Sequence, residues 1–196
     1  GYSDGVGTSA QFFNPGGVAI DPTGAFALVA DTINHRIRRV DVGTGATTTL
    51  AGSGTSGYSD GVGTSAGFLY PRGVAIDPAG AFALVADANN NRIRRVDVST
   101  GATTTLAGST YGYSDGVGTS AQFFSPRGVA IDPAGAIALV ADASNHRIRR
   151  VDVSTGATTT LAGSTYGYSD GVGTSAQFFN PGGVAIDPTG AFALVA

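Results

Sequence analysis

The sequence contains no cysteine, methionine, tryptophan, lysine or glutamate. Without cysteine it forms neither a disulfide framework nor a thiolate site for metal or redox chemistry. All positive side-chain charge comes from arginine and all negative charge from aspartate, and the 11 basic and 14 acidic residues leave a formal net charge of -3. This acidic balance argues against a nucleic-acid binder. No apolar run approaches the length of about 20 residues that a membrane-spanning helix needs, so we expect no membrane insertion.

The sequence consists of one unit that is repeated several times. Residues 1–30 recur without a change as residues 167–196, and edited copies of the same phrase begin at Gly57 and Gly112. The units have the bounds 1–56, 57–111, 112–166 and, for a partial copy, 167–196. A fixed period of this kind marks a repeat architecture. We therefore predict one repeat domain over residues 1–196.

Each unit reads as a long linker followed by four short strands. In the first unit the linker covers Gly1 to Pro15, and the expected strands are 17–21, 26–30, 36–42 and 46–52. The apolar run Phe26–Ala30 suits a strand that is covered on both faces. The threonine-rich fourth strand suits an outer edge that meets solvent. Within the third strand, Ile37 and Val40 cannot share a face unless the strand carries a bulge.

The spacing of these strands indicates a β-propeller. No segment keeps helical apolar spacing over three turns, so we expect essentially no helix. Four strands in about 40–50 residues are typical of one propeller blade. The fold class predicted is therefore an all-β propeller of four-stranded antiparallel blades. Three blades are complete, and residues 167–196 supply a linker and the first two strands of a partial fourth.

One set of motifs resembles a known repeat. Pro-x-Gly-Val-Ala-Ile-Asp-Pro-x-Gly, Leu-Val-Ala-Asp and Asn-His-Arg-Ile-Arg occur at Pro15–Gly24, Leu28–Asp31 and Asn34–Arg38. They return in the third unit, and the second unit departs from them with Asn91 in place of the histidine. This pattern resembles the NHL repeat, and the linkers resemble those of bacterial and extracellular NHL proteins. The resemblance implies a propeller, usually six-bladed, whose faces mostly bind protein, RNA or glycan, and it favours an extracellular location.

Three full units and two strands are too few to close a ring, because about four blades is the lower limit. The apolar faces between blades and the unpaired strand edges would be left open. We therefore predict a homo-oligomer, or a ring completed by a longer polypeptide, with six blades favoured over seven. The sequence also stops at Ala196, inside the expected second strand. We interpret this as an engineered or trimmed fragment, or as a window on a longer repeat protein.

The turn before the third strand provides the candidate binding surface. Its residues are His35, Asn91, His146, Arg36, Arg92 and Arg147. The two histidines belong to separate units, and asparagine replaces the middle one, so we expect local hydrogen bonding and no metal site. The aspartates that begin these turns are expected to cap them through backbone N–H groups and to pair with the first arginine of the run. These turn-capping residues are Asp31, Asp87 and Asp142.

Other candidate chemistries have weaker support. The linker aspartates lack the dense alternating oxygen ligands of a calcium loop, so we expect Asx-type turns. They are Asp4, Asp60, Asp115 and Asp170. Each Arg-Ile-Arg-Arg run is followed closely by aspartate, with no exposed aromatic interleaved, which favours inter-blade salt bridges over a nucleic-acid site. No nucleophile–histidine pair is present, and identical repeats give carboxylates identical environments, which does not separate an acid from a base.

We therefore expect a non-catalytic scaffold with no cofactor and no metal. Its partners would be further copies of itself and a protein or glycan ligand, because near-identical blades present repeated surfaces that suit multivalent contact. Two alternatives stay open. One is a carbohydrate-binding or adhesion propeller, which predicts one sugar per blade. The other is a metal-dependent propeller lyase or hydrolase, which predicts an ion held by at least three side chains.

Overall fold

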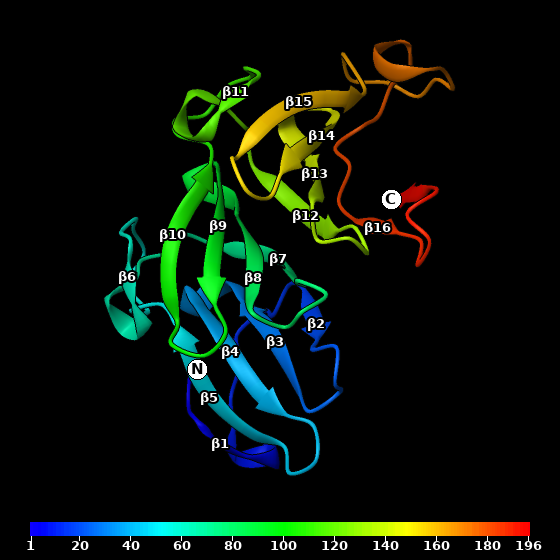
Figure 1. The fold of residues 1–196 in the computed structure, drawn as a ribbon. Helices are drawn as coiled ribbons and strands as arrows, with labels where there is room; N and C mark the ends of the chain where they lie inside the picture. The colour runs from blue at the N-terminus through cyan, green and yellow to red at the C-terminus, as the bar shows by residue number, and fades with distance from the viewer.

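The computed structural model describes residues 1–196 and contains four antiparallel sheets (Figure 1). The first sheet comprises β1 (Gly5–Val6), β2 (Val18–Ile20), β3 (Phe26–Asp31), β4 (Arg36–Asp41) and β5 (Ala46–Ala51). The second comprises β6 (Gly61–Val62), β7 (Pro71–Ile76), β8 (Phe82–Asp87), β9 (Arg92–Asp97) and β10 (Ala102–Ala107). The third comprises β11 (Gly116–Val117), β12 (Pro126–Ile131), β13 (Ile137–Asp142), β14 (Arg147–Asp152) and β15 (Ala157–Ala162). The fourth comprises β16 (Val184–Ile186) and β17 (Ala193–Val195).

Each large sheet is a four-stranded meander with a short extra strand at its outer edge. The order in the first sheet is β1-β5-β4-β3-β2, and the other two large sheets repeat it. The strand β1 comes from the linker and pairs with β5, with Gly5 opposite Thr47. The predicted all-β propeller fold is confirmed, but the blades have five strands and not four. The linker strand occupies part of an edge that would otherwise present unpaired N–H and C=O groups.

The helical content consists of short 3₁₀ turns only. They are η1 (Gly7–Ser9), η2 (Thr32–Asn34), η3 (Gly63–Ser65), η4 (Ala88–Asn90), η5 (Gly118–Ser120), η6 (Ala143–Asn145) and η7 (Gly173–Ser175). Such turns are common as connectors, and here they lie in the linkers and before β4, β9 and β14. None of them has the length and apolar character that a membrane span requires.

The hydrophobic core lies between neighbouring sheets. Phe26 and Leu28 on one face of β3 pack in one cluster with Ala83 and Val85 on the facing side of β8. The next pair of sheets repeats this arrangement with the corresponding residues. Successive strand residues point to opposite faces of the sheet. An unbroken apolar run can therefore pack against a neighbouring sheet on each side. Each blade is therefore stabilised mainly by the blades beside it.

The third strand of the first sheet, β4, carries no bulge of its own. Ile37 lies opposite Ala30 and Val40 lies opposite Ala27, so Ile37 and Val40 point to opposite faces of β4. The register shift occurs in the pairing of β4 with β5, between Ile37 and Arg38. The equivalent residues of the second unit, Ile93 and Val96, are both fully buried because that sheet has a neighbouring sheet on each face, whereas Val40 lies on the outer side of the first sheet and is only partly buried.

The inner strands β2, β7, β12 and β16 meet along a common axis, and the sheets follow one another around it (Figure 1). Their backbones come into direct contact: Gly17 N donates a hydrogen bond to Arg72 O at 2.6 Å. A Cβ atom on Gly17 would lie 2.7 Å from the same carbonyl oxygen. Glycine is therefore required here for close backbone approach.

Candidate functional site

The residues before the third strands occupy strained but equivalent positions. His35, Asn91 and His146 each end a 3₁₀ turn in the left-handed conformation, with φ of 53°, 55° and 57°. Outside glycine this conformation is uncommon, and asparagine and histidine are among the residues enriched in it. The turn therefore fixes the backbone of all three residues in the same way, whichever side chain is present.

Each of these side chains accepts a hydrogen bond from a backbone N–H group of the following unit. The bonds run from Tyr70 N to His35 Nδ1 at 3.2 Å, from Ser125 N to Asn91 Oδ1 at 3.0 Å, and from Asn180 N to His146 Nδ1 at 3.1 Å. Histidine Nδ1 and asparagine Oδ1 are both acceptors. The exchange of His for Asn therefore preserves one inter-blade bond, which we call the inter-blade strap.

The strap requires a neutral histidine. An imidazole that accepts at Nδ1 carries its proton on Nε2, and a second proton would turn the acceptor into a donor facing another donor. Burial lowers the pKa of His35, and the neighbouring Arg36 charge lowers it further. Both causes favour the neutral form that the strap needs.

The histidines do not come together with other metal-ligating groups. His35 and His146 each bond to a different following unit. His, Cys, Asp and Glu side chains nowhere gather in groups of three or more that would hold a metal ion. The hydrogen bonds of these turns therefore join neighbouring blades, and the expected local bonding within the turn is wrong.

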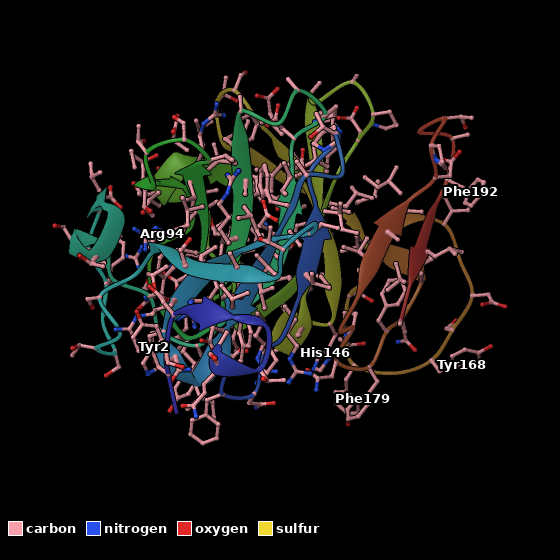
Figure 2. All side chains as sticks on the ribbon, turned by 90° about the horizontal axis from the view of Figure 1, so that it is seen from below. Tyr2, Arg94, His146, Tyr168, Phe179 and Phe192 are labelled. Atoms are coloured by element: carbon pink, nitrogen blue, oxygen red, sulfur yellow. The ribbon has the colours of Figure 1, made fainter.

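Aromatic rings surround the straps and give this face an apolar surface. His35 meets Tyr70 edge-on with ring centroids 4.8 Å apart, and His146 stacks on Phe179 at 5.9 Å (Figure 2). Asn91 lines a shallow pocket of about 340 Å³ with two further aromatic rings, those of Tyr111 and Phe124. Partly exposed aromatic side chains of this kind are frequent in protein contact surfaces.

The first arginine of each run packs on a linker tyrosine. The guanidinium of Arg36 lies 3.8 Å above the ring of Tyr2, and those of Arg92 and Arg147 lie 3.9 Å above their equivalents. Arg92 also donates to the carbonyl oxygen of Asn90 at 2.7 Å. The stacking fixes the linker against the blade.

The second arginine of each run forms a buried ion-pair centre. Arg94 Nη1 donates to Asp87 Oδ2 at 2.9 Å and to Gly67 O at 3.0 Å. Its Nη2 donates to Asp60 Oδ1 at 2.7 Å and to Ser59 O at 2.9 Å. The side chains of Arg94 (labelled in Figure 2) and Asp87 are fully buried. One guanidinium thus joins the blade turn to both ends of its linker.

Three sequence-based expectations are corrected by this centre. Asp87 pairs with the second arginine of its run and not with the first. Asp60 is an ion-pair partner and not simply an Asx-turn residue. The salt bridges lie within one unit and not between blades. The same pairs recur in the other complete units, as Arg38 with Asp31 and Asp4, and as Arg149 with Asp142 and Asp115.

The expected capping of the turns by Asp31, Asp87 and Asp142 is wrong, because none of these side chains accepts from a backbone N–H group of the turn that it begins. Asp87 Oδ1 accepts from Leu69 N at 2.8 Å, and its Oδ2 accepts from Asn90 Nδ2 at 2.8 Å. Burial raises the pKa of the Asp87 carboxyl, and these hydrogen bonds together with the Arg94 charge act against that rise. The carboxylate is therefore held by donors from the linker, the turn and the strand together.

Arg72 and Arg127 are functional candidates that the sequence motif concealed. Both line a groove of about 420 Å³ along the inner strands. In the motif they occupy the variable position of Pro-x-Gly-Val, where Gly16 and Gly182 stand in the first and last units. The signal in the sequence was a change from glycine to a charged residue within otherwise near-identical copies.

None of the protein-family models searched matches the chain. The chain is similar to SUPPRESSOR OF QUENCHING 1, a chloroplastic protein of Arabidopsis thaliana, with 31% identity over 198 residues that cover 94% of this chain and 19% of that protein. It is 40% identical to human NHL repeat-containing protein 2 over 101 residues, which cover 51% of this chain and 14% of that protein. The chain thus spans less than a fifth of the length of either relative.

The fold has close counterparts among solved structures. The crystal structure of an auxiliary nutrient binding protein from Bacteroides ovatus superposes with a TM-score of 0.73 at 21% identity, over 95% of this chain and 46% of that one. This likeness shows the fold alone. The repeat motifs, the blade-like sheets and the similarity to NHL repeat-containing protein 2 agree with one another. Together these findings support an NHL-repeat β-propeller family for this chain.

Proposed function

We propose that this chain is a non-catalytic interaction scaffold whose two end faces take up further blades to build a ring. The NHL-type propeller fold supports a protein-interaction scaffold in general terms. The observation that carries the finer proposal is a pair of open apolar faces that match the faces buried inside the chain.

The first open face lies on the outer side of the first sheet. Val18 on β2 is 65% exposed, whereas its equivalent Val74 on β7 is only 6% exposed because the first sheet covers it. Ile20 lies two residues further along the same face and is equally exposed. This surface is a blade interface without its neighbouring blade.

The second open face lies on the last hairpin. Phe192 is 61% exposed, whereas its equivalent Phe82 is 8% exposed because the third sheet covers it. Leu194, two residues further along, is exposed as well. Figure 2 shows Phe192 at the outer side of this hairpin, away from the other sheets.

The two open faces are complementary. Inside the chain, the face that carries Phe26 packs on the face that carries Val74. Phe192 and Val18 are the equivalents of these residues at the opposite ends. Head-to-tail contact through such faces produces a ring when the rotation closes. The added blades come from a second copy or from further polypeptide of the same kind.

Substitutions on one end face test this proposal. In the double variant Val18→Asp/Ile20→Asp, two carboxylates would have to be buried in the contact, which opposes association. The matched control is Val62→Asp, because Val62 is 60% exposed on the outer rim of the second sheet and away from both end faces. Size exclusion with light scattering should show assembly by the wild-type chain and by the control variant.

The double variant should elute as a monomer with unchanged β-sheet circular dichroism. The proposal is wrong if the wild-type chain is monomeric, or if the control variant loses assembly to the same degree as the double variant.

A further inference from the structure

Arg72 and Arg127 are the two arginines outside the Arg-Ile-Arg-Arg runs, and neither makes a hydrogen bond, an ion pair or a ring stack within the protein. Every hydrogen bond that an arginine side chain donates comes from the Arg-Ile-Arg-Arg runs. All six salt bridges also come from these runs. Arg72 and Arg127 stand outside the runs, on the inner strands β7 and β12. Their guanidinium groups thus lack the counter-charges that the buried arginines have.

Both arginines line the groove that runs along the axis of the blades. Its lining residues come from four inner segments, 16–17, 72–74, 127–129 and 182–184. The other lining residues are glycine and valine, so the groove carries two positive charges and no carboxylate. A site with one sign of charge between low-dielectric walls attracts ions of the opposite sign.

Backbone packing fixes the Cα positions of Arg72 and Arg127. A Cβ atom on Gly73 would overlap the carbonyl oxygen of Arg127, as a Cβ atom on Gly17 would overlap that of Arg72. Neighbouring inner strands therefore touch at this level, and the two arginines project from adjacent strands at equivalent positions. The two guanidinium groups belong to one groove, and each is a planar group of N–H donors.

Arg127 is half-buried, and its Nε is buried without a hydrogen-bond partner, as are the Nε atoms of six arginines in the runs. Of these seven arginines, only Arg127 lines the axial groove. The glycines at positions 16 and 182 show that the fold does not need arginine at this level of the axis.

We propose that Arg72 and Arg127 form an anion-binding site in the axial groove. Its ligand is a small molecule that carries a phosphate or carboxylate group. Guanidinium groups bind both kinds of oxyanion through paired N–H donors. The groove volume of about 420 Å³ suits a small ligand. This inference concerns the axis of the blades and is independent of how the end faces are covered.

Isothermal titration with inorganic phosphate and, separately, with citrate tests the site. The variants are Arg72→Gly and Arg127→Gly, which restore the residue found at positions 16 and 182. Each should weaken binding by at least about tenfold, the usual size of a lost charge-assisted hydrogen bond. The double variant should bind neither ion. Comparing the two titrations shows whether the site prefers phosphate or carboxylate.

Two further variants separate a built site from general charge attraction. Arg150→Ala removes the same charge from an exposed arginine of β14 outside the groove, so it should leave binding unchanged. Gly182→Arg adds a third guanidinium where a Cβ atom meets only Ala196 O, at 3.8 Å, and should tighten binding.

The proposal is overturned if the wild-type chain binds neither ion at low salt. It is equally overturned if the double glycine variant still binds, or if Arg150→Ala loses as much affinity as Arg72→Gly. Unchanged thermal unfolding of each variant rules out misfolding as the cause of a loss.

Discussion

At the residue scale, position within the Arg-Ile-Arg-Arg run decides what each arginine does. In the second unit Arg92 stacks on Tyr58, Arg94 is buried between two aspartates, and Arg95 stacks on Phe82 at 3.5 Å. Arg150 has no such ring, because isoleucine occupies the equivalent of Phe82 in the third unit. Arg92 and Arg94 share one face of β9 and differ in how deeply they are buried, whereas Arg95 lies on the opposite face.

The buried centre makes Arg94 the most sensitive arginine. Replacing it with methionine would leave Asp87 as a buried and uncompensated carboxylate. Breaking a buried pair in this way costs about 3–5 kcal/mol. Urea unfolding monitored by circular dichroism should show this loss. Arg95→Met removes the same charge from a ring stack and should cost about 1 kcal/mol or less. Equal losses in the two variants would contradict the buried role of Arg94.

The strap makes stability depend on pH through His35. Its pKa is lowered below the ordinary 6.5 in the folded state, so protons bind more tightly to the unfolded chain. The contribution of His35 to the free energy of unfolding is therefore complete above pH 6.5. It is lost as the pH falls from 6.5 to the lowered pKa of the folded state. His35→Asn keeps the acceptor, as Asn91 does in the second unit. On acidification the wild-type chain should lose more unfolding free energy than the variant. A difference between the two that stays constant with pH would contradict the inter-blade strap at His35.

At the element scale, the sequence predicted the four main strands of each unit closely, because period, turn residues and apolar runs are local signals. The expected cover of the run Phe26–Ala30 on both faces is found for its equivalent in the second unit, at β8, whereas in the first unit Ala27 and Val29 lie on the open side of the sheet and are only partly buried. The fifth strand was missed, since Gly5–Val6 carries no strand pattern and is defined only by pairing with β5.

The ion-pair centre was missed for a related physical reason. Asp4 and Arg38 are 34 residues apart in the sequence, and only the folded linker brings them to 2.7 Å. The expected partner of Asp31 was the nearer arginine, Arg36. Arg36 and Arg38 are two residues apart and lie on the same face of β4. Arg36 donates to Asn34 O and Ser53 O, whereas Arg38 reaches both carboxylates. The position of the folded linker decides between the two arginines, and motif spacing does not specify that position.

The contact between inner strands predicts an element-scale sensitivity at Gly17. Alanine there would place its Cβ 2.7 Å from Arg72 O, so β2 and β7 would have to separate. We expect a loss of about 1–3 kcal/mol, as for other overpacked sites. Gly43→Ser is the control, because its Cβ would meet only Asp41 Oδ1 at 3.6 Å and the other complete units already have serine there. Thermal unfolding of both variants checks this, and an unaffected Gly17→Ala would refute the close approach.

At the scale of the whole molecule, the core, the straps and the axial contacts all join one unit to the next. A blade in the middle of the chain has both apolar faces covered, whereas the first and last units each have one face open. Repeat architectures derive much of their stability from such nearest-neighbour interfaces. We therefore expect the two end faces to attract further blades.

The most direct test of this central claim is the solution mass of the unmodified 196-residue chain by sedimentation equilibrium over a wide range of concentration. We expect a mass above the 19.4 kDa of one chain, rising with concentration towards that of a closed assembly. A constant mass of 19.4 kDa throughout, with cooperative unfolding, would contradict it.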